Sequence, residues 1–211
     1  GKGSESPYVV ELDPTTACNL ACPDCISRDL LNQGYFSRKR LREITKEMVD
    51  SGVKAVVLIG GGEPLAHPEI GWVIEYLAQN DVQVGITTNG LLIDRYLDCI
   101  AEHASWVRVS MDAASSETYN FFRPSPSGKS MFDKAVENMG NLAKVKNFID
   151  ERFYYESDGN YFSFWKSMLG KKVGFRIVDN IDKSFLNVPH IPSQKGYDEW
   201  EKDGGVYSYF P

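Results

Sequence analysis

Residues 8–25 read YVVELDPTTACNLACPDC and join a short apolar run to a loop with three cysteines. The run over 8–12 is rich in β-branched residues, which predicts a strand. The cysteines that follow are spaced C-x3-C-x2-C, at Cys18, Cys22 and Cys25. Long loops at the carboxyl ends of strands are where α/β folds place their chemistry. This stretch therefore predicts an α/β fold whose first strand leads into a functional loop.

The alternation of strand and helix continues to about residue 146. Short β-branched runs alternate with longer amphipathic stretches, the pattern of a parallel sheet covered by helices. Further strands are predicted over 55–59, 83–87 and 106–111. Helices are predicted over 38–51, 68–79, 116–121 and 131–145. The strand starts at 55, 83 and 106 are spaced as expected for successive β/α units.

The sequence after residue 146 has a different character. Of the 26 aromatic residues, 15 lie in the last 65 positions. Residues 151–155 and 160–165 flank Ser157-Asp158-Gly159, and an Asp-Gly pair between two β-favouring runs predicts a hairpin. Residues 172–178 predict one more strand. The regular repeat is expected to stop at this point.

Composition and charge limit the partners. No apolar run approaches the roughly 18 residues of a membrane span, and GKGSES at 1–6 is too polar and short for a signal peptide. A cytoplasmic protein without a membrane partner is expected. The chain carries 23 Lys and Arg against 29 Asp and Glu, a formal charge of -6. Because a phosphate-backbone binder usually has a basic excess, nucleic acid is not expected as a partner.

The cysteine spacing points to a metal centre. Three thiolates on one short loop can converge on one centre, but they cannot complete a tetrahedral zinc site. The nearest other candidates, His67, Cys99 and His103, are far away in sequence. Three cysteines suit a 4Fe-4S cluster that leaves one iron open to another ligand. A zinc-stapled structural module and a regulatory thiol cluster stay open as alternatives.

Residues 18–25, CNLACPDC, resemble the signature of radical S-adenosylmethionine (SAM) enzymes. After the second predicted strand, Gly60-Gly61-Gly62-Glu63-Pro64 resembles the GGE motif of that family. The resemblance implies that the backbone at Gly61 and Gly62, together with Glu63, holds the SAM amino group. Glycines suit this role because backbone carbonyls can approach an ammonium without an intervening Cβ.

Fainter resemblances follow at the next strand ends. Thr88-Asn89-Gly90 and Ser110-Met111-Asp112 resemble the polar strand ends that contact the SAM ribose and carboxylate in the family. Arg123 resembles an arginine that would pair with the SAM carboxylate or an anionic substrate. Plainer explanations exist for each. Asn89-Gly90 is also turn chemistry, Ser110 and Asp112 are also helix caps, and Arg123 is also a solvent-facing charge.

The resemblance to the MoaA/SPASM-like branch of the family covers about residues 8–146. It implies an α/β partial (β/α)6 TIM-like barrel with a divergent aromatic-rich C-terminal region. We expect a disordered segment over 1–7, a core of four β/α units over 8–146, and a barrel-closing or cap region with the hairpin over 147–211. One departure is Asp24, because the family commonly has an aromatic residue before the last cysteine.

The implied function is that of an enzyme. The resemblance implies reductive cleavage of SAM at the cluster to a 5′-deoxyadenosyl radical, which abstracts hydrogen from a small-molecule or peptide substrate. A reductase such as flavodoxin or ferredoxin is the expected electron donor. No cysteine follows Cys99, so one cluster is expected, and Cys99 itself is expected to be a buried core thiol. The alternative is a catalytically silent iron-sulfur electron carrier or sensor.

Overall fold

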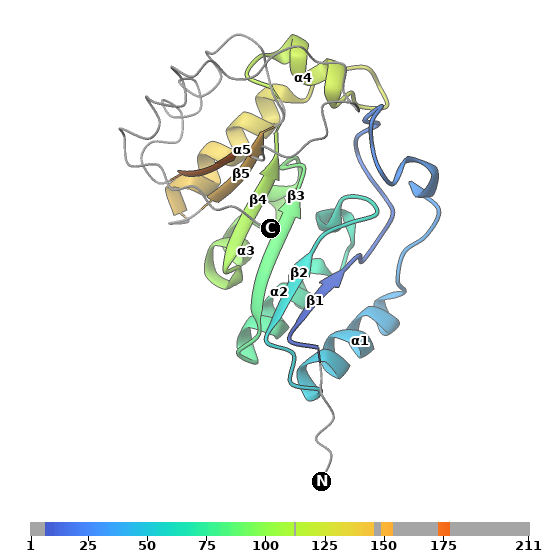
Figure 1. The fold of residues 1–211 in the computed structure, drawn as a ribbon, viewed down its shortest axis with the longest axis vertical. Helices are drawn as coiled ribbons and strands as arrows, with labels where there is room; N and C mark the ends of the chain where they lie inside the picture. The colour runs from blue at the N-terminus through green and yellow to red at the C-terminus, as the bar shows by residue number, and fades with distance from the viewer. Residues whose placement is uncertain (1–6, 112, 146–148, 154–172, 178–211) are drawn as a thin grey trace.

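The computed structural model describes residues 7–111, 113–145, 149–153 and 173–177. Its centre is one six-stranded sheet in the order β1-β2-β3-β4-β5-β6, and every neighbouring pair is parallel (Figure 1). The strands are β1 (Val9–Leu12), β2 (Ala55–Leu58), β3 (Gln83–Thr88), β4 (Trp106–Ser110), β5 (Ile149–Phe153) and β6 (Val173–Ile177). Because spatial order follows chain order, all connections proceed in one direction along the sheet, as in a barrel.

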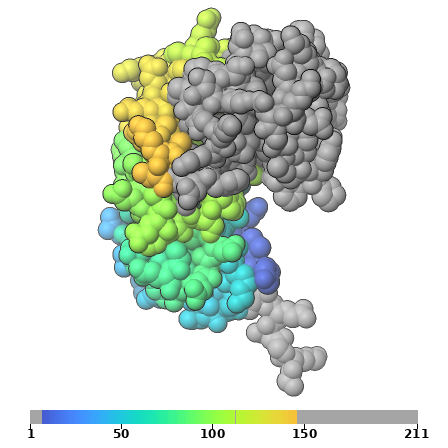
Figure 2. All heavy atoms as spheres, turned by 90° about the vertical axis from the view of Figure 1, so that its left-hand side faces the viewer, coloured from blue at the N-terminus to red at the C-terminus, as the bar shows by residue number. Residues whose placement is uncertain are grey.

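Helices follow each of the first four strands. They are α1 (Arg38–Asp50), α2 (Ile70–Gln79), α3 (Leu97–His103), α4 (Ser116–Phe122) and α5 (Phe132–Val145). In order, α1 contacts α2, α2 contacts α3, and α3 contacts α5. Figure 2 shows part of this outer layer, where α3 and α5 lie next to each other. None of the described helices is long and apolar enough to cross a membrane.

The hydrophobic core lies between the helices and one face of the sheet. Alternate strand residues are fully buried there, and they come from three neighbouring strands: Val56, Leu58, Val84, Ile86, Val107 and Val109. Leu41 of α1 and Ile74 of α2 are also fully buried in this core. Burying one such side chain stabilises the fold by about 1.5–3 kcal/mol. The intervening residues Thr87 and Arg108 are only half-buried, so the second face of the sheet is more polar.

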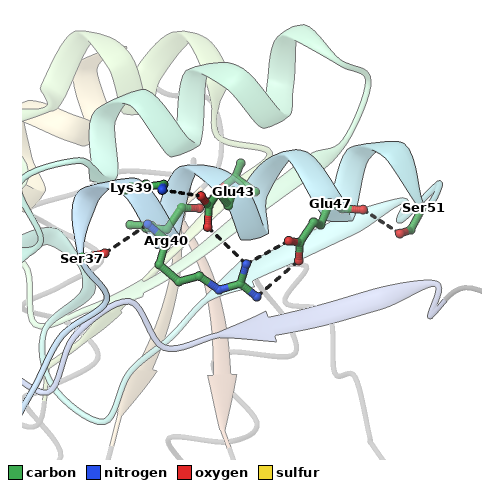
Figure 3. A network of polar contacts seen from close by, with 8 residues as sticks. Ser37, Lys39, Arg40, Glu43, Glu47 and Ser51 are labelled. Atoms are coloured by element: carbon green, nitrogen blue, oxygen red, sulfur yellow. Dashed lines mark hydrogen bonds and ion pairs between the residues drawn. The ribbon is translucent and has the colours of Figure 1, made fainter.

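Local signals explain where the helices begin and end. Ser37 caps α1 by accepting a hydrogen bond from the backbone of Arg40, and Gly52 just beyond the helix has φ +82°. Such a left-handed conformation favours glycine. On the exposed side of α1, the Arg40 guanidinium bridges Glu43 and Glu47 (Figure 3).

The first four strands and the helices α1, α2, α4 and α5 are confirmed within one or two residues of the predicted bounds, whereas no bounds were predicted for α3. The largest shift is at α2, which begins at Ile70 and not at residue 68. A short 3-10 helix, Pro64–Ala66, occupies the preceding stretch, and the Glu63 side chain caps it. Residues 68 and 69, which the pattern predicts as the start of the helix, belong instead to the loop after β2.

The parallel sheet continues beyond the point where the repeat was expected to stop. The strand predicted over 172–178 is present as β6. Residues 151–153, predicted to begin a hairpin, belong instead to β5, which is flanked by β4 and β6 in parallel. The β-favouring run over 151–155 predicts a strand, but the choice of neighbours depends on contacts distant in sequence. The partner segment 160–165 lies outside the described residues, as do 1–6, Asp112 and the rest of 147–211.

Candidate functional site

The loop that carries the three cysteines runs from β1 to α1 and folds back on itself. The Thr16 backbone donates a hydrogen bond to the Gly34 carbonyl at 2.9 Å and accepts one from Asn32 at 2.8 Å. The side chain of Asn32 in turn accepts a hydrogen bond from the Cys18 backbone at 3.2 Å. The backbone of Cys18 is thus hydrogen-bonded to the later part of the same loop, near Asn32.

Cys18, Cys22 and Cys25 form no disulfide with one another and are half-buried. The Cys25 backbone N–H donates to the Cys22 carbonyl at 3.3 Å, so a turn separates these two cysteines. Burial raises the pKa of the Cys18 thiol, and the nearby charges of Glu63 and Cys25 raise this pKa further, against a hydrogen bond from the Leu20 backbone. A thiol in such a position needs a cation to become a thiolate.

The arrangement of the three cysteines bears on the kind of metal centre that they could hold. Among the described residues, no three His, Cys, Asp or Glu side chains meet closely enough to hold one metal ion. A cubane places its ligands on different iron atoms, so three thiolates on one loop fit it without meeting at a point.

The glycine loop after β2 packs directly against the cysteine loop. The Glu63 backbone N–H donates to the Ala17 carbonyl at 2.8 Å. A Cβ on Gly62 would overlap the Ala17 oxygen and lie 2.5 Å from the Thr16 carbonyl carbon. Gly62 is therefore required for this close packing. At Gly61 the nearest atom would be 3.5 Å away, which is ordinary van der Waals contact.

Glu63 is buried, and its carboxylate joins two strand ends. One oxygen accepts hydrogen bonds from the Thr88 hydroxyl at 2.6 Å and the Leu65 backbone at 3.1 Å. The other accepts from the Asn89 backbone at 2.7 Å. Burial raises the pKa of Glu63, and these hydrogen bonds oppose that shift. Since a carboxylate offers about four acceptor positions, about one is left for a further donor.

Asn89 combines turn chemistry with a contact to the cysteine loop. Its Oδ1 accepts a hydrogen bond from the Leu91 backbone at 3.0 Å, and Gly90 has φ +84°. Its Nδ2 donates to Asn19 Oδ1 at 2.7 Å and lies 3.9 Å from the Cys18 sulfur. The end of β3 is therefore linked to the cysteine loop by a side chain.

Arg123 is half-buried, which differs from the solvent-facing alternative. It follows α4, and one guanidinium nitrogen lies 4.0 Å from the Cys22 sulfur. Beside it, the Pro124 carbonyl accepts a hydrogen bond from the Ala21 backbone at 2.8 Å. Figure 1 shows that the cysteine loop and the loop after α4 meet at the same end of the sheet. The charge of Arg123 also lowers the pKa values of Cys18 and Glu63.

The capping alternative for Ser110 is wrong. Ser110 is the last residue of β4, and the N-cap of α4 is Ser115, whose side chain accepts from the Thr118 backbone. Ser110 is half-buried at the same strand end as the rest of the site. Asp112 lies outside the described residues.

The sequence missed three residues as parts of the site. Thr88 and Asn19 bind Glu63 and Asn89, respectively, and the Asp13 carboxylate accepts a hydrogen bond from the Gly61 backbone. The sequence signal that could have identified them is their position, because each polar residue lies at the end of a strand or directly after a cysteine. His67, which received no role, is buried and links the Phe36 carbonyl at 2.8 Å to the Glu69 backbone at 3.1 Å. Cys99 is half-buried and packs against the core.

Similarity to known proteins agrees with this geometry. Residues 12–150 match the profile of the Radical SAM superfamily. The mycofactocin maturase MftC of Mycobacterium tuberculosis is 31% identical over 145 residues, which are 67% of this chain and 36% of the relative. The GTP 3′,8-cyclase of a Synechocystis species is 32% identical over 111 residues, which are 50% of this chain and 34% of the relative.

Two solved structures share the fold. Streptococcus suis SuiB bound to precursor peptide SuiA has a TM-score of 0.71 at 16% identity, covering 95% of this chain and 48% of SuiB. Native anSMEcpe with bound AdoMet and Kp18Cys peptide has a TM-score of 0.65 at 22% identity, covering 93% and 61%. The chain thus spans about a third to two-thirds of the length of these relatives. Because the profile match covers more than half of it, the chain belongs to the radical SAM superfamily, whose members bind SAM and a 4Fe-4S cluster, here through Cys18, Cys22 and Cys25.

Proposed function

We propose that the protein is a radical SAM enzyme that abstracts a hydrogen atom from a peptide. The observation that carries this proposal is the direct packing of the glycine loop on the cysteine loop, through Gly62 and the 2.8 Å hydrogen bond from Glu63 to Ala17. This contact supports the proposal, because the motif that resembles the SAM-binding GGE motif then lies beside the cysteine loop. A plain electron carrier has no need of such a motif.

The cofactors supply the difficult step. SAM and the cluster, once reduced by one electron, supply a carbon radical strong enough to take hydrogen from an unactivated C–H bond. The task of the chain is to bind the cofactors and the substrate, to orient them, and to exclude water from the site.

Two charged side chains, Glu63 in the loop after β2 and Arg123 after α4, would bind the SAM amino-acid group. The free acceptor position and negative charge of Glu63 suit the ammonium. Arg123 suits the carboxylate, because a guanidinium binds carboxylates in a planar, two-point geometry. Ser110 and Asp112 would contact the ribose, and the backbone at Gly61 is open enough to approach the ligand.

The relatives support a peptide substrate, and the sheet supports a polar one. MftC is named a maturase, and SuiB and anSMEcpe were each solved with a bound peptide. In this chain, the Thr87 hydroxyl is buried without a hydrogen-bond partner among the described residues. An unsatisfied buried hydroxyl costs about 1–3 kcal/mol. A polar substrate such as a peptide would relieve this cost on the face of the sheet opposite the helices.

The test of the enzymatic activity is release of 5′-deoxyadenosine. The chain is reconstituted anaerobically with iron and sulfide, mixed with SAM and dithionite, and analysed by liquid chromatography. We expect 5′-deoxyadenosine from the wild type and none from Cys22→Ala. A wild type that carries a reducible cluster yet releases none would instead be the electron carrier or sensor.

A second candidate is a small-molecule substrate, because a GTP 3′,8-cyclase is among the relatives. The two candidates are separated by adding extract fractions from a bacterial host to the reaction. If the substrate is a peptide, treating the active fraction with protease abolishes the stimulation of 5′-deoxyadenosine release. Stimulation that survives protease and passes a 1 kDa filter, a cutoff of about ten residues, contradicts the peptide proposal.

A further inference from the structure

We propose that the Asn89 carboxamide raises the reduction potential of the cluster by directing an N–H group at the Cys18 sulfur. This role differs from the ribose or carboxylate contact that the strand-end resemblance implies. It rests on the proposed function only in requiring that Cys18 ligates an iron of the cluster. Asn89 is thus a positioning residue that acts on the cofactor through one of its ligands.

The orientation of the Asn89 carboxamide follows from its neighbours. Leu91 presents a backbone N–H at 3.0 Å, so the atom facing it is an acceptor and must be Oδ1. The amide nitrogen therefore points the other way. There it meets the acceptor Oδ1 of Asn19 at 2.7 Å and the sulfur of Cys18 at 3.9 Å. In a flipped amide, the Asn89 nitrogen would face the Leu91 N–H donor, and the Asn89 oxygen would face the Asn19 oxygen.

The side chain of Asn89 is also held in place. It is 6% exposed, and its own backbone N–H donates to the buried Glu63 carboxylate at 2.7 Å. With one amide hydrogen on Asn19, the second is directed at Cys18, at the outer limit of N–H···S contact. The backbone N–H of Leu20 approaches the same sulfur at 3.5 Å.

A donor at a ligand sulfur affects the two redox states unequally. The reduced cluster carries one more negative charge, part of which resides on the ligand sulfurs, so an N–H dipole stabilises the reduced form more. Partial burial strengthens this effect because solvent screens it less. The nearby Glu63 carboxylate acts with the opposite sign and the Arg123 guanidinium with the same sign. Asn89 is the neutral member of this set and can be changed without deleting a charge.

The first variant is Asn89→Asp, and Asn89→Ser, which adds no charge, then decides whether a fall in potential comes from the lost N–H donor. It keeps the shape and the oxygen that accepts from Leu91, but it replaces the amide donor with an oxygen facing Cys18. We expect the equilibrium constant for one-electron reduction to fall about tenfold or more, and tenfold is 59 mV for such a couple. The measurement is a redox titration of the reconstituted full chain without SAM, followed by electron paramagnetic resonance. An unchanged midpoint potential overturns the proposal.

Two further variants are controls. One adds the same charge at a distant site, and the other removes a contact that holds the cysteine loop. Asn80→Asp makes the same change at an exposed site at the C-terminal end of α2, and we expect the wild-type potential. Asn19→Ala breaks the 2.7 Å contact to Asn89 but leaves the donor at the sulfur. It should lower the iron content per chain and leave the potential of the loaded fraction unchanged. If Asn19→Ala lowers the potential as much as Asn89→Asp, Asn89 only holds the loop and the proposal fails.

A milder variant separates the lost donor from the added charge, and it also covers the case in which Asn89→Asp does not load iron. Asn89→Ser keeps a short side-chain acceptor for Leu91 and removes the donor at the sulfur, so we expect a smaller fall in potential. A Ser variant with the wild-type potential also overturns the proposal. Failure of the proposed function gives a different result, namely a wild type without a 4Fe-4S signal or with a signal that SAM does not change.

Discussion

The backbone N–H of Glu63 lies 2.8 Å from the carbonyl oxygen of Ala17, so the loop after β2 is hydrogen-bonded to the loop that carries the cysteines. This contact is possible because Gly62 has no side chain between the two backbones. The motif expected to bind SAM and the loop expected to bind the cluster thus form one structural unit.

Gly62→Ala tests this unit. The added methyl group would lie 2.5 Å from the Thr16 carbonyl carbon, and backbone cannot move aside as a side chain can. Overpacking of this kind typically costs about 1–3 kcal/mol. We expect a lower free energy of unfolding in urea and less iron bound per chain after reconstitution. Gly61→Ala is the matched control for stability, because its nearest neighbour would be 3.5 Å away, and equal losses in both variants would contradict the close-packing argument.

Glu63→Gln should break at least one hydrogen bond at the strand ends without changing the size of the side chain. At least one donor among Thr88, Asn89 and Leu65 would then face an amide N–H group in place of an acceptor. An unsatisfied buried group of this kind costs about 1–3 kcal/mol. Urea unfolding measures this loss, and the Thr88→Val variant should show part of it. A Gln variant as stable as the wild type would mean that the carboxylate is not needed as an acceptor.

Glu63 also predicts a pH dependence. Because burial raises its pKa above the ordinary value of 4.5, the folded chain binds this proton more tightly than the unfolded chain. The contribution of Glu63 to stability is therefore greatest below 4.5 and is lost as the pH rises through the raised folded pKa. Affinity for SAM should change in the opposite direction, since the ammonium prefers the ionised carboxylate. Equilibrium dialysis of the reconstituted protein should show weaker SAM binding as the pH falls, and Glu63→Gln should flatten this trend.

Arg123→Met should weaken SAM binding and make Cys18 harder to ionise. Arg123 is the positive charge that lowers the pKa of Cys18, so removing it raises that pKa further. In the apo chain, alkylation of Cys18 by iodoacetamide at pH 8 should slow, as followed by mass spectrometry. SAM affinity should fall about tenfold, which corresponds to 1.4 kcal/mol. Arg123→Lys keeps the charge and should restore the alkylation rate more fully than the affinity, because lysine lacks the two-point geometry.

Two ion-pair networks on α1 should differ in their contribution to stability. Glu69 is 7% exposed and binds both Arg42 and Arg38, and the Arg42 guanidinium lies 4.6 Å from the Trp72 ring centre. Hydrogen bonds to charged groups contribute about 1.5–3 kcal/mol, so Glu69→Ala should measurably destabilise the chain. The network around Arg40 in Figure 3 is exposed, and Arg40→Ala should leave the urea midpoint unchanged within error. Equal effects of the two substitutions would contradict this ranking.

Local sequence was sufficient for the first four strands and for the cysteine and glycine motifs. Runs such as residues 55–59 are apolar and β-branched over the length of a strand, and the cysteine spacing is itself a local pattern. The neighbours of β5 were not predictable in this way. A short run such as IDERF can pair on either edge and in either direction, and only contacts distant in sequence decide the choice.

The sequence by itself determined which residues are expected to carry the chemistry, because the local motifs around Cys18, Cys22, Cys25 and Glu63 record residue type and spacing. Only the tertiary structure decided how these residues are supported. Asn19 and Asn89 are separated by 70 positions, and their contact exists because parallel strands bring their carboxyl ends to one edge of the sheet. Likewise, the need for glycine at position 62 comes from the approach of a second backbone, which no local pattern records.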